Sequence, residues 1–151
     1  MGSAGARRLS VTVDANILVY ASNRADPVHA VAVDLVDRLV AGPDLVYLFW
    51  PTIMAYLRLV THPAVLPRAL PPNAARSNIE ALLTQPHVRS PGESSGFWEI
   101  FLATAGQHLR GNDVPDAHIA GLMRQHDVGL IYTRDRGFKR FPGVTAQDPF
   151  E

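Results

Sequence analysis

The stretch VTVDANILVY, residues 11–20, decides how the rest of the chain is interpreted, because it places one carboxylate between two apolar runs. Residues 9–13, LSVTV, are rich in β-branched side chains, and such a run is typical of a short buried strand. Asp14 therefore stands at the predicted carboxyl end of a strand, and Asn16 follows two positions later. A carboxylate in this place indicates either a local turn or cap, or a functional site.

Apolar runs and helical patterns alternate along the rest of the chain. Strands that alternate with helices of ten or more residues indicate a parallel sheet covered on both faces. Strands are expected at residues 44–50, within 86–92, and at 130–133 and 144–150, and helices at 26–42, 52–62, 73–85, 94–111 and 114–126. The pattern predicts an α/β fold, a three-layer α/β/α sandwich with a mainly parallel central sheet. One domain is expected over residues 1–151, with residues 1–8 flexible.

The helix expected at residues 26–42 carries signals at both ends. Asp26 is the expected N-cap, Pro27 is the expected first helical residue, and Gly42 follows the last turn. The helix expected at residues 94–111 has a serine cap and a terminal glycine. Its FWEIF cluster is expected to pack in the core or in a subunit interface, in preference to stacking on nucleic-acid bases.

The composition limits the function classes that fit. Fourteen basic and fourteen acidic residues cancel, so a nucleic-acid partner would need a local basic patch. The chain has no cysteine, which excludes disulfides, thiolate zinc sites and a cysteine nucleophile. No apolar run approaches the roughly 20 residues of a membrane span, and the start of the chain lacks the apolar core of a secretory signal. We therefore expect a cytoplasmic protein without a membrane segment.

Carboxylates gather at the predicted carboxyl edge of the sheet, where open parallel sheets place their binding crevice. Asp14 ends the first strand and Asp135 follows the strand LIYT. Asp116 lies in the first turn of the helix at 114–126, and Asp113 comes just before that helix. Ordinary interpretations stay open for all of them. Asp14 and Asp135 also fit turns, while Asp113 and Asp116 also fit a helix cap and a favourable charge at a helix N-terminus.

Acids that meet at one sheet edge would repel one another, and a cation or a proton would offset that repulsion. Hard carboxylate oxygens select Mg²⁺ or Mn²⁺, and carboxylate-held Mg²⁺ suits phosphodiester hydrolysis. Other chemistries fit less well. The six histidines form no H-x-x-x-H pair, and the chain has no G-x-S-x-G, no P-loop and no G-x-G-x-x-G. Zinc hydrolases, serine hydrolases, nucleoside triphosphatases and dinucleotide enzymes are therefore not indicated.

Three segments of the chain match the pattern of one known family. They are VDANILVY (13–20), WPTIMAYLRLVTHPAVL (50–66) and VPDAHIAGLMRQHDVGLIYTRDRGFKRFPGV (114–144). In this order and spacing they resemble the PIN-domain ribonucleases, and within them the VapC-like toxins of type II toxin–antitoxin systems, in the branch abundant in mycobacteria. The similarity runs from Leu9 to Phe150. The resemblance implies a PIN-like α/β/α fold.

The resemblance also assigns the acidic site of the family to residues of this chain. The implied catalytic and metal-holding residues are Asp14, Asp116 and Asp135. The implied supporting residues are Asn16, Asp113, Thr133 and Asn112. Many family members carry a Glu on the helix after the second strand, where this chain has Ala55, so one carboxylate of the pattern is missing. One firmly held Mg²⁺ is therefore expected, with Mn²⁺ as a possible substitute, and substrate phosphate would help to recruit any second ion.

By the same resemblance, the chain is expected to be a Mg²⁺-dependent endoribonuclease toxin. Its expected activity is hydrolysis of phosphodiester bonds in structured RNA, either tRNA or rRNA, with inhibition of translation. The expected partners are a second copy in a homodimer and a VapB-like antitoxin that blocks the acidic site, often with a basic residue. RNA affinity would come from basic residues of TRDRGFKRF, a segment that also fits a solvated turn: Arg134, Arg136, Lys139 and Arg140.

Two other functions are weighed against this one. A phosphoacceptor protein of the response-regulator type also places acids, a Thr and a Lys at strand ends. Such a protein needs an acidic pair after the first strand and an acceptor Asp on the middle strand, and this chain provides neither. A catalytically weak or inactive PIN-like module that binds RNA or an antitoxin is the alternative that the sequence leaves open.

Overall fold

A five-stranded parallel sheet forms the centre of the computed structural model, which describes residues 9–151. The strand order is β3-β2-β1-β4-β5, and every neighbouring pair is parallel. The strands are β1 (Ser10–Val13), β2 (Leu45–Tyr47), β3 (Val88–Arg89), β4 (Leu130–Tyr132) and β5 (Thr145–Gln147). The predicted strands, including the two edge strands, are confirmed. The expectation of flexibility for residues 1–8 lies outside the described residues.

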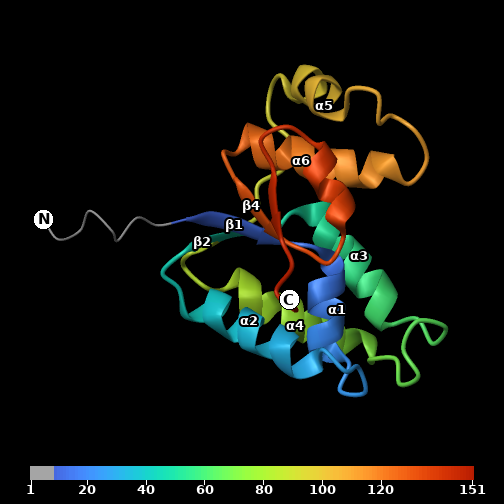
Figure 1. Ribbon diagram of the computed structural model, residues 1–151. Coiled ribbons are helices and arrows are strands. Elements are labelled where there is room, and N and C mark those ends of the chain that lie inside the picture. Colours follow the sequence, from blue (N-terminus) through green and yellow to red (C-terminus); the bar gives the residue numbers. More distant parts are fainter. Residues whose placement is uncertain (1–8) are drawn as a thin grey trace, which may run out of the picture.

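Helices cover both faces of this sheet (Figure 1). One face carries α1 (Ala15–Ser22), α2 (His29–Ala41), α3 (Trp50–Val60) and α4 (Pro72–Leu83). The other face carries α5 (Phe97–Ala105) and α6 (Asp113–Gln125), which pack closely on each other. The three-layer α/β/α sandwich expected from the sequence is therefore confirmed. Within residues 9–151, no helix combines the length and apolar character needed to cross a bilayer.

Alternating side chains of the short strands pack into two separate apolar cores, one on each face of the sheet. On β4, Tyr132 packs among the side chains of the α1–α4 layer, whereas its neighbour Ile131 packs in the α5–α6 layer. On β1, Val11 and Val13 face the α1–α4 layer and are almost fully buried. Because successive strand side chains point to opposite faces, three-residue strands suffice to join both layers.

The first helix, α1, was not predicted from the sequence. The run NILVY that forms it contains β-branched and aromatic residues, which favour strands when judged locally. It is helical because Ile17, Leu18 and Val19 all find burial against the α1–α4 core, and tertiary packing overrides a weak local preference. The chain therefore turns into a helix directly after Asp14.

Two predicted helix boundaries were wrong. α2 begins at His29, and Asp26 does not cap it, because the Asp26 carboxylate accepts a hydrogen bond from the Val28 N–H inside the preceding turn. α5 ends at Ala105, since Gly106 takes a left-handed backbone with φ of 53°. The residue that caps its start is Gly96, without a side-chain hydrogen bond from a serine.

The aromatic cluster on α5 divides between the core and the surface. Phe101 is buried and Phe97 is partly buried against the same core, which confirms the packing role expected for these two rings. Trp98 on the same helix is 63% exposed. Part of the cluster is therefore left on the surface of the described chain.

The strand order places a binding crevice between β1 and β4. From β1 the chain first adds β2 and β3 on one side and later adds β4 and β5 on the other, so the direction of winding reverses between β1 and β4. Ligand sites of open α/β sheets lie beyond the carboxyl ends of the strands at such a point. Asp14 directly follows β1 and Thr133 directly follows β4.

Candidate active site

Asp14 and Thr133 are brought together by the pairing of β1 with β4. The last residues of the two strands, Val13 and Tyr132, are register partners. The next residue of each strand is therefore also adjacent: the Asp14 N–H donates to the Tyr132 carbonyl at 2.9 Å, and the Thr133 hydroxyl donates to Asp14 Oδ2 at 2.8 Å. Thr133 is buried, so its hydrogen bond is shielded from bulk water and fixes the orientation of the Asp14 carboxylate.

Asp135 is tied to the same threonine. Its N–H donates to Thr133 Oγ1 at 2.9 Å, which makes one hydroxyl the link between both strand-end acids. The Asp135 carboxylate then accepts a hydrogen bond from the Gly137 N–H at 2.8 Å and caps the short 3₁₀ helix η2 (Arg136–Arg140). The solvated turn considered from the sequence is thus a capped helical turn that starts at the sheet edge.

Asp116 and Asp113 come from the first turn of α6, and neither is the N-cap of that helix. The N-cap position is taken by Asn112, which makes no side-chain capping bond. Both carboxylates instead hold one cation: Arg140 Nη2 lies 2.8 Å from Asp113 Oδ1 and 3.2 Å from Asp116 Oδ2. The two acids therefore bind η2 to the start of α6.

The carboxylates of Asp14, Asp116 and Asp135 act on one another electrostatically. Burial raises the pKa of Asp14, the Thr133 hydroxyl opposes that effect, and the charge of Asp135 adds to the increase. Burial also raises the pKa of Asp116 to about 6, with Arg140 opposing and the charges of Asp135 and Asp14 reinforcing the shift. Arg140 therefore offsets only part of the increase in the Asp116 pKa that burial and the neighbouring acids cause.

Asp14 and Asp116 line the same small cavity, of about 120 Å³, together with Ala55 on α3. Ala55, which stands where the family pattern has a Glu, thus lines the cavity that contains these two acids. Asp135 and Thr133 line a neighbouring cavity of about 480 Å³ together with Lys139. Among residues 9–151, no three acidic or histidine side chains stand close enough to hold a metal ion jointly.

That spacing has a local cause in hydrogen bonding. Each acid is drawn towards a different donor: Asp14 towards Thr133, Asp135 towards Gly137, and Asp116 towards Arg140. Because like charges repel, each acid is stabilised by a donor of its own. The sequence brings the acids to one sheet edge, and their local partners decide how far they converge.

The remaining predicted site residues occupy different surroundings. Asn16 and Asn112 are exposed, and within residues 9–151 neither side chain has a hydrogen bond to the acids. Arg134 is exposed, with its guanidinium over the rings of Tyr20 and Phe150 at 5.6 and 5.3 Å. Arg136 pairs with the carboxylate of Glu151 at 2.6 Å, while Lys139 is exposed beside Asp135.

Two features of this region were missed by sequence reasoning. Arg140 was grouped with the basic residues for RNA, yet it is turned towards the acids of α6. Tyr56 is not among the predicted site residues, yet its hydroxyl bonds to Ser22 at 2.7 Å and accepts a hydrogen bond from Asn78 at 2.9 Å. These contacts join residues 22 to 34 positions apart, and no local pattern indicates them.

The model of the family described as PIN domain matches residues 11–144. Ribonuclease VapC48 of Mycobacterium tuberculosis is 48% identical over 143 residues, which cover 94% of this chain and 99% of that protein. The chain belongs to the VapC family of PIN-domain ribonucleases. PIN nucleases generally depend on a divalent metal. In this VapC-family chain, the acidic edge of the sheet is the candidate site for such a metal.

Solved structures agree with this VapC fold. The structure of VapC20 from Mycobacterium tuberculosis, described as a sarcin-ricin loop cleaving toxin, matches with a TM-score of 0.62 and 19% identity over 89% of this chain and 98% of that chain. The VapBC2 complex from Rickettsia felis, bound to a DNA fragment from its promoter, contains a chain that matches with a TM-score of 0.64 and 15% identity, over 92% of this chain and 98% of that chain. At these identities the likeness concerns the fold alone.

Proposed function

We propose that this VapC-family chain is a Mg²⁺-dependent endoribonuclease toxin that hydrolyses phosphodiester bonds in structured RNA, and thereby inhibits translation. The observation that carries the proposal is the group of Asp14, Asp116 and Asp135 at the switch point of the sheet, where each of the first two has a pKa raised in part by the other acids. Asp14 and Asp116 are half-buried and Asp135 is exposed; a bound cation would offset the repulsion among them, and phosphodiester chemistry uses such a cation.

The donor set fits a hard divalent ion. The described residues that line the two cavities at this edge offer carboxylate oxygens of Asp14, Asp116 and Asp135 and no thiolate or imidazole, and such hard oxygens suit Mg²⁺ or Mn²⁺. Asp14, Asp116 and Asp135 would hold the ion, which when bound supplies an acidified water and stabilises charge on the phosphate oxygens. Asp116 would have to release Arg140 to take part fully.

The residues of the chain itself position these acids. Thr133 orients the Asp14 carboxylate, and because the same hydroxyl accepts from the Asp135 N–H, it fixes the spacing of the two strand ends. A hydroxyl that donates to the carboxylate favours its ionised form, which is the form that binds a cation. Since Thr133 is buried, this alignment is present before substrate arrives.

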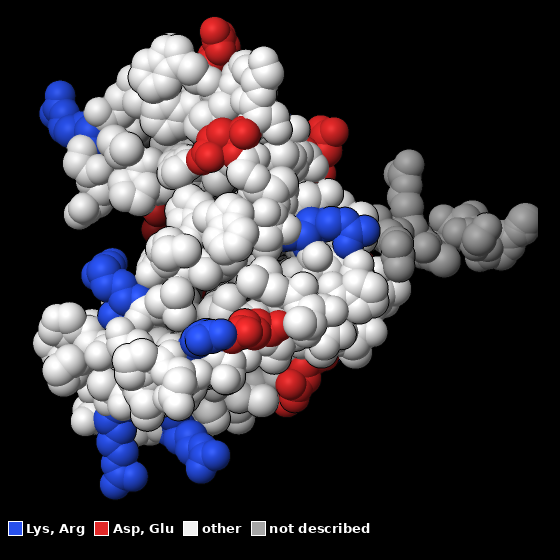
Figure 2. Space-filling model, turned by 180° about the vertical axis from the view of Figure 1, so that it is seen from behind, with Lys and Arg blue, Asp and Glu red and all other residues white. Residues whose placement is uncertain are grey.

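Structured RNA, as tRNA or rRNA, is the proposed substrate class. VapC20, which shares the fold, is described as cleaving the sarcin-ricin loop. The face drawn in Figure 2 is mostly uncharged, with basic and acidic groups scattered over it, so no broad basic surface is visible there. We propose that cations beside the acidic edge, Arg134, Arg136 and Lys139, supply the phosphate contacts instead.

Cleavage of total cellular RNA with Mg²⁺, compared with EDTA, tests the enzyme directly. Asp14→Asn and Asp116→Asn are expected to lower the cleavage rate at least about 100-fold, because metal catalysis supplies several kcal/mol. Asp34→Asn, an exposed acid on α2, is the matched control and should cut at the parental rate. Sequencing the 5′ ends of the fragments identifies the RNA. Equal cutting in EDTA, or by all three variants, would contradict the proposal and leave the non-catalytic PIN-like module as the function.

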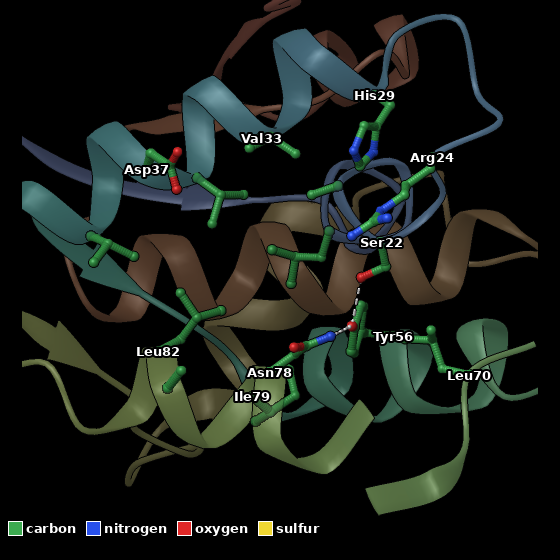
Figure 3. A pocket seen from close by; sticks show the side chains of 15 residues that line it. Ser22, Arg24, His29, Val33, Asp37, Tyr56, Leu70, Asn78, Ile79 and Leu82 are labelled. Carbon is green, nitrogen blue, oxygen red and sulfur yellow. Dashed lines mark hydrogen bonds between the residues drawn. The ribbon is translucent and has the colours of Figure 1, made fainter. Parts of the chain in front are cut away.

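A VapB-like antitoxin is the proposed partner, and a groove lined by apolar side chains together with Arg24, His29 and Asp37 offers it a place (Figure 3). This groove, of about 430 Å³, lies between α1, α2, α3 and α4. Val33 of α2 lines one side and Leu82 of α4 the other, while the hydrogen-bonded hydroxyls of Ser22 and Tyr56 stand at one end. A groove of this composition fits the apolar face of an amphipathic helix.

Co-purification with a VapB-like antitoxin tests the groove. Val33→Lys puts a long charged side chain into the groove and is expected to release the partner, because an ammonium is unfavourable to bury against an apolar helix face even beside Asp37. Val31→Lys changes an exposed valine of the same helix and should leave the complex intact. Retention of the partner by both variants would place the antitoxin on another surface.

A homodimer is also proposed. Apolar side chains that a second copy would cover are exposed on two helices: Trp50 and Met54 on α3, and Trp98 and Leu102 on α5. Light scattering of the purified chain is expected to give twice the monomer mass, and Trp98→Lys is expected to give a monomer if α5 lies in the interface. A monomeric parent would contradict this part of the proposal.

A further inference from the structure

Arg140 is a partly buried cation in direct contact with the candidate acids. Its side chain is 22% exposed, and Nη2 reaches both Asp113 Oδ1 and Asp116 Oδ2. The proposed metal ligand Asp116 is thus already occupied on Oδ2 by a positive group of the chain itself. Arg136, on the same 3₁₀ helix, is far more exposed and pairs with Glu151.

The guanidinium of Arg140 is enclosed by an aromatic ring and a glycine. Its carbon atom stands 4.5 Å from the centre of the Phe141 ring, which is the geometry of a cation–π contact. On another side, a Cβ at position 137 would collide with Arg140 Nη1, so the close approach requires Gly137. A side chain held between an aromatic ring, a glycine and two carboxylates has a defined place near the acids.

This place does not satisfy the guanidinium fully. Arg140 Nε is buried and has no hydrogen-bond partner, which is unfavourable for a donor removed from water. Asp116 is also held loosely, since its oxygen lies 3.2 Å from Arg140 Nη2, whereas the Asp113 oxygen lies at 2.8 Å. Both members of the pair are therefore open to a better partner.

We propose that Arg140 is a built-in competitor of the divalent cation: it occupies Asp116 in the metal-free protein and moves onto Asp113 alone when the ion binds. This inference rests on the proposed function, because it takes Asp116 as a metal ligand. A divalent ion on Asp116 would meet the positive guanidinium at ion-pair distance, and like charges cannot share one carboxylate oxygen favourably.

Asp113 is suited to keep the displaced arginine. It lies on the same turn of α6, its contact with Arg140 is the shorter of the two, and its side chain is 41% exposed. The imidazole of His108, with Nδ1 3.8 Å from Asp113 Oδ2, is the other group beside it. Asp113 therefore acts on the metal through Arg140, as a positioning residue, and not as a ligand.

Calorimetric titration with Mn²⁺ separates these roles. Arg140→Gln is expected to bind Mn²⁺ about tenfold more tightly than the parent, within the 5- to 150-fold range typical of coupled sites. Asp113→Asn should bind it several-fold more weakly, because Arg140 then depends on Asp116. In the double variant, Asp113→Asn should add nothing to Arg140→Gln, since its effect runs through the arginine. Arg76→Gln, at an exposed arginine of α4, is the control and should leave the dissociation constant unchanged.

Folding is checked by circular dichroism, and Arg140→Met, which keeps the apolar contact with Phe141, replaces Arg140→Gln if the latter does not fold. Unchanged or weaker Mn²⁺ binding after loss of Arg140 would overturn the competitor while leaving the metal site in place. A further loss of affinity on adding Asp113→Asn to Arg140→Gln would make Asp113 a ligand and overturn its assigned role. Absence of Mn²⁺ binding in the parent and in every variant would remove the metal site and this inference together.

Discussion

The Thr133 hydroxyl donates a 2.8 Å hydrogen bond to Asp14 Oδ2, joining residues 119 positions apart in the chain. The pairing of Val13 with Tyr132 at the ends of β1 and β4 makes this contact unavoidable once the sheet forms. Because Thr133 also receives the N–H of Asp135, the alignment of the strand-end acids depends on one buried side chain.

Thr133→Val is expected to destabilise the protein by about 1 to 3 kcal/mol, the usual cost of leaving buried hydrogen-bonding groups unpaired. Loss of the hydroxyl also removes a group that lowers the pKa of Asp14, so that pKa should rise further. Urea unfolding at pH 7 measures the change. Thr133→Ser keeps the hydroxyl and is the control; if the valine variant matched the serine variant in stability, the bond would be energetically unimportant.

Asp116 should make the metal-free protein less stable as pH rises from about 4 to about 6. Its pKa is about 6 in the folded chain against an ordinary value of 3.8, so in this window the folded state binds more protons than the unfolded state. The free energy of unfolding therefore falls as pH rises. The full shift corresponds to about 3 kcal/mol, which partial exposure reduces to about 1 to 2 kcal/mol.

Asp116→Asn mimics the protonated acid and should remove that fall. Measured in EDTA, the variant is expected to gain stability over the parent between pH 4 and pH 7, whereas Asp34→Asn should follow the parent at every pH. Parallel stability curves for the parent and Asp116→Asn would show that the folded-state pKa is not raised.

Mg²⁺ or Mn²⁺ should raise the melting temperature. Saturation at 100 times the dissociation constant corresponds to about 2.7 kcal/mol, or roughly 5 to 10 °C for a chain of this size. Asp14→Asn should lose most of this gain because it removes a proposed ligand on the more buried side of the site. Thermal scans with and without millimolar metal decide the matter: a melting temperature indifferent to both ions speaks against a formed site.

Ala55→Glu should strengthen metal binding, because position 55 on α3 lines the cavity shared by Asp14 and Asp116. A fourth carboxylate adds a hard ligand and increases the negative field, so Mn²⁺ affinity should rise several-fold, on the order of 1 kcal/mol. Ala55→Gln has nearly the same volume without the charge and should not show the gain. Equal affinities for the Glu and Gln variants would mean that the new carboxylate does not reach the ion.

Arg134→Ala should weaken RNA binding with reduced salt dependence. The guanidinium is held over Tyr20 and Phe150, so little freedom is lost when it contacts a phosphate. Loss of one phosphate contact reduces the magnitude of the slope of log K against log salt by about 0.7 to 0.9, the values for single strands and duplexes. Fluorescence anisotropy in EDTA gives the slope, and Arg76→Ala, an exposed arginine of α4, is the control. An unaltered slope would remove Arg134 from the RNA surface.

Local patterns predicted the strands well and some helices poorly. The β-branched runs around residues 9–13 and 130–133 became adjacent strands because their preference and their burial agree. The run at residues 15–22 has similar local preferences yet forms α1, because only a helix lets Ile17, Leu18 and Val19 pack on the α1–α4 core. Such a choice depends on partners far away in the chain.

The sequence by itself determined the alternation of strands and helices, and therefore the parallel sheet and the edge at which Asp14, Asp116 and Asp135 appear. That much follows from local periodicity and from the rule that parallel strands end on one side. Only the tertiary structure decided which donor each acid faces: Thr133 for Asp14, and Arg140 for Asp116. The physical reason is that a hydrogen bond depends on distances of a few tenths of an ångström between side chains, which packing sets and periodicity does not.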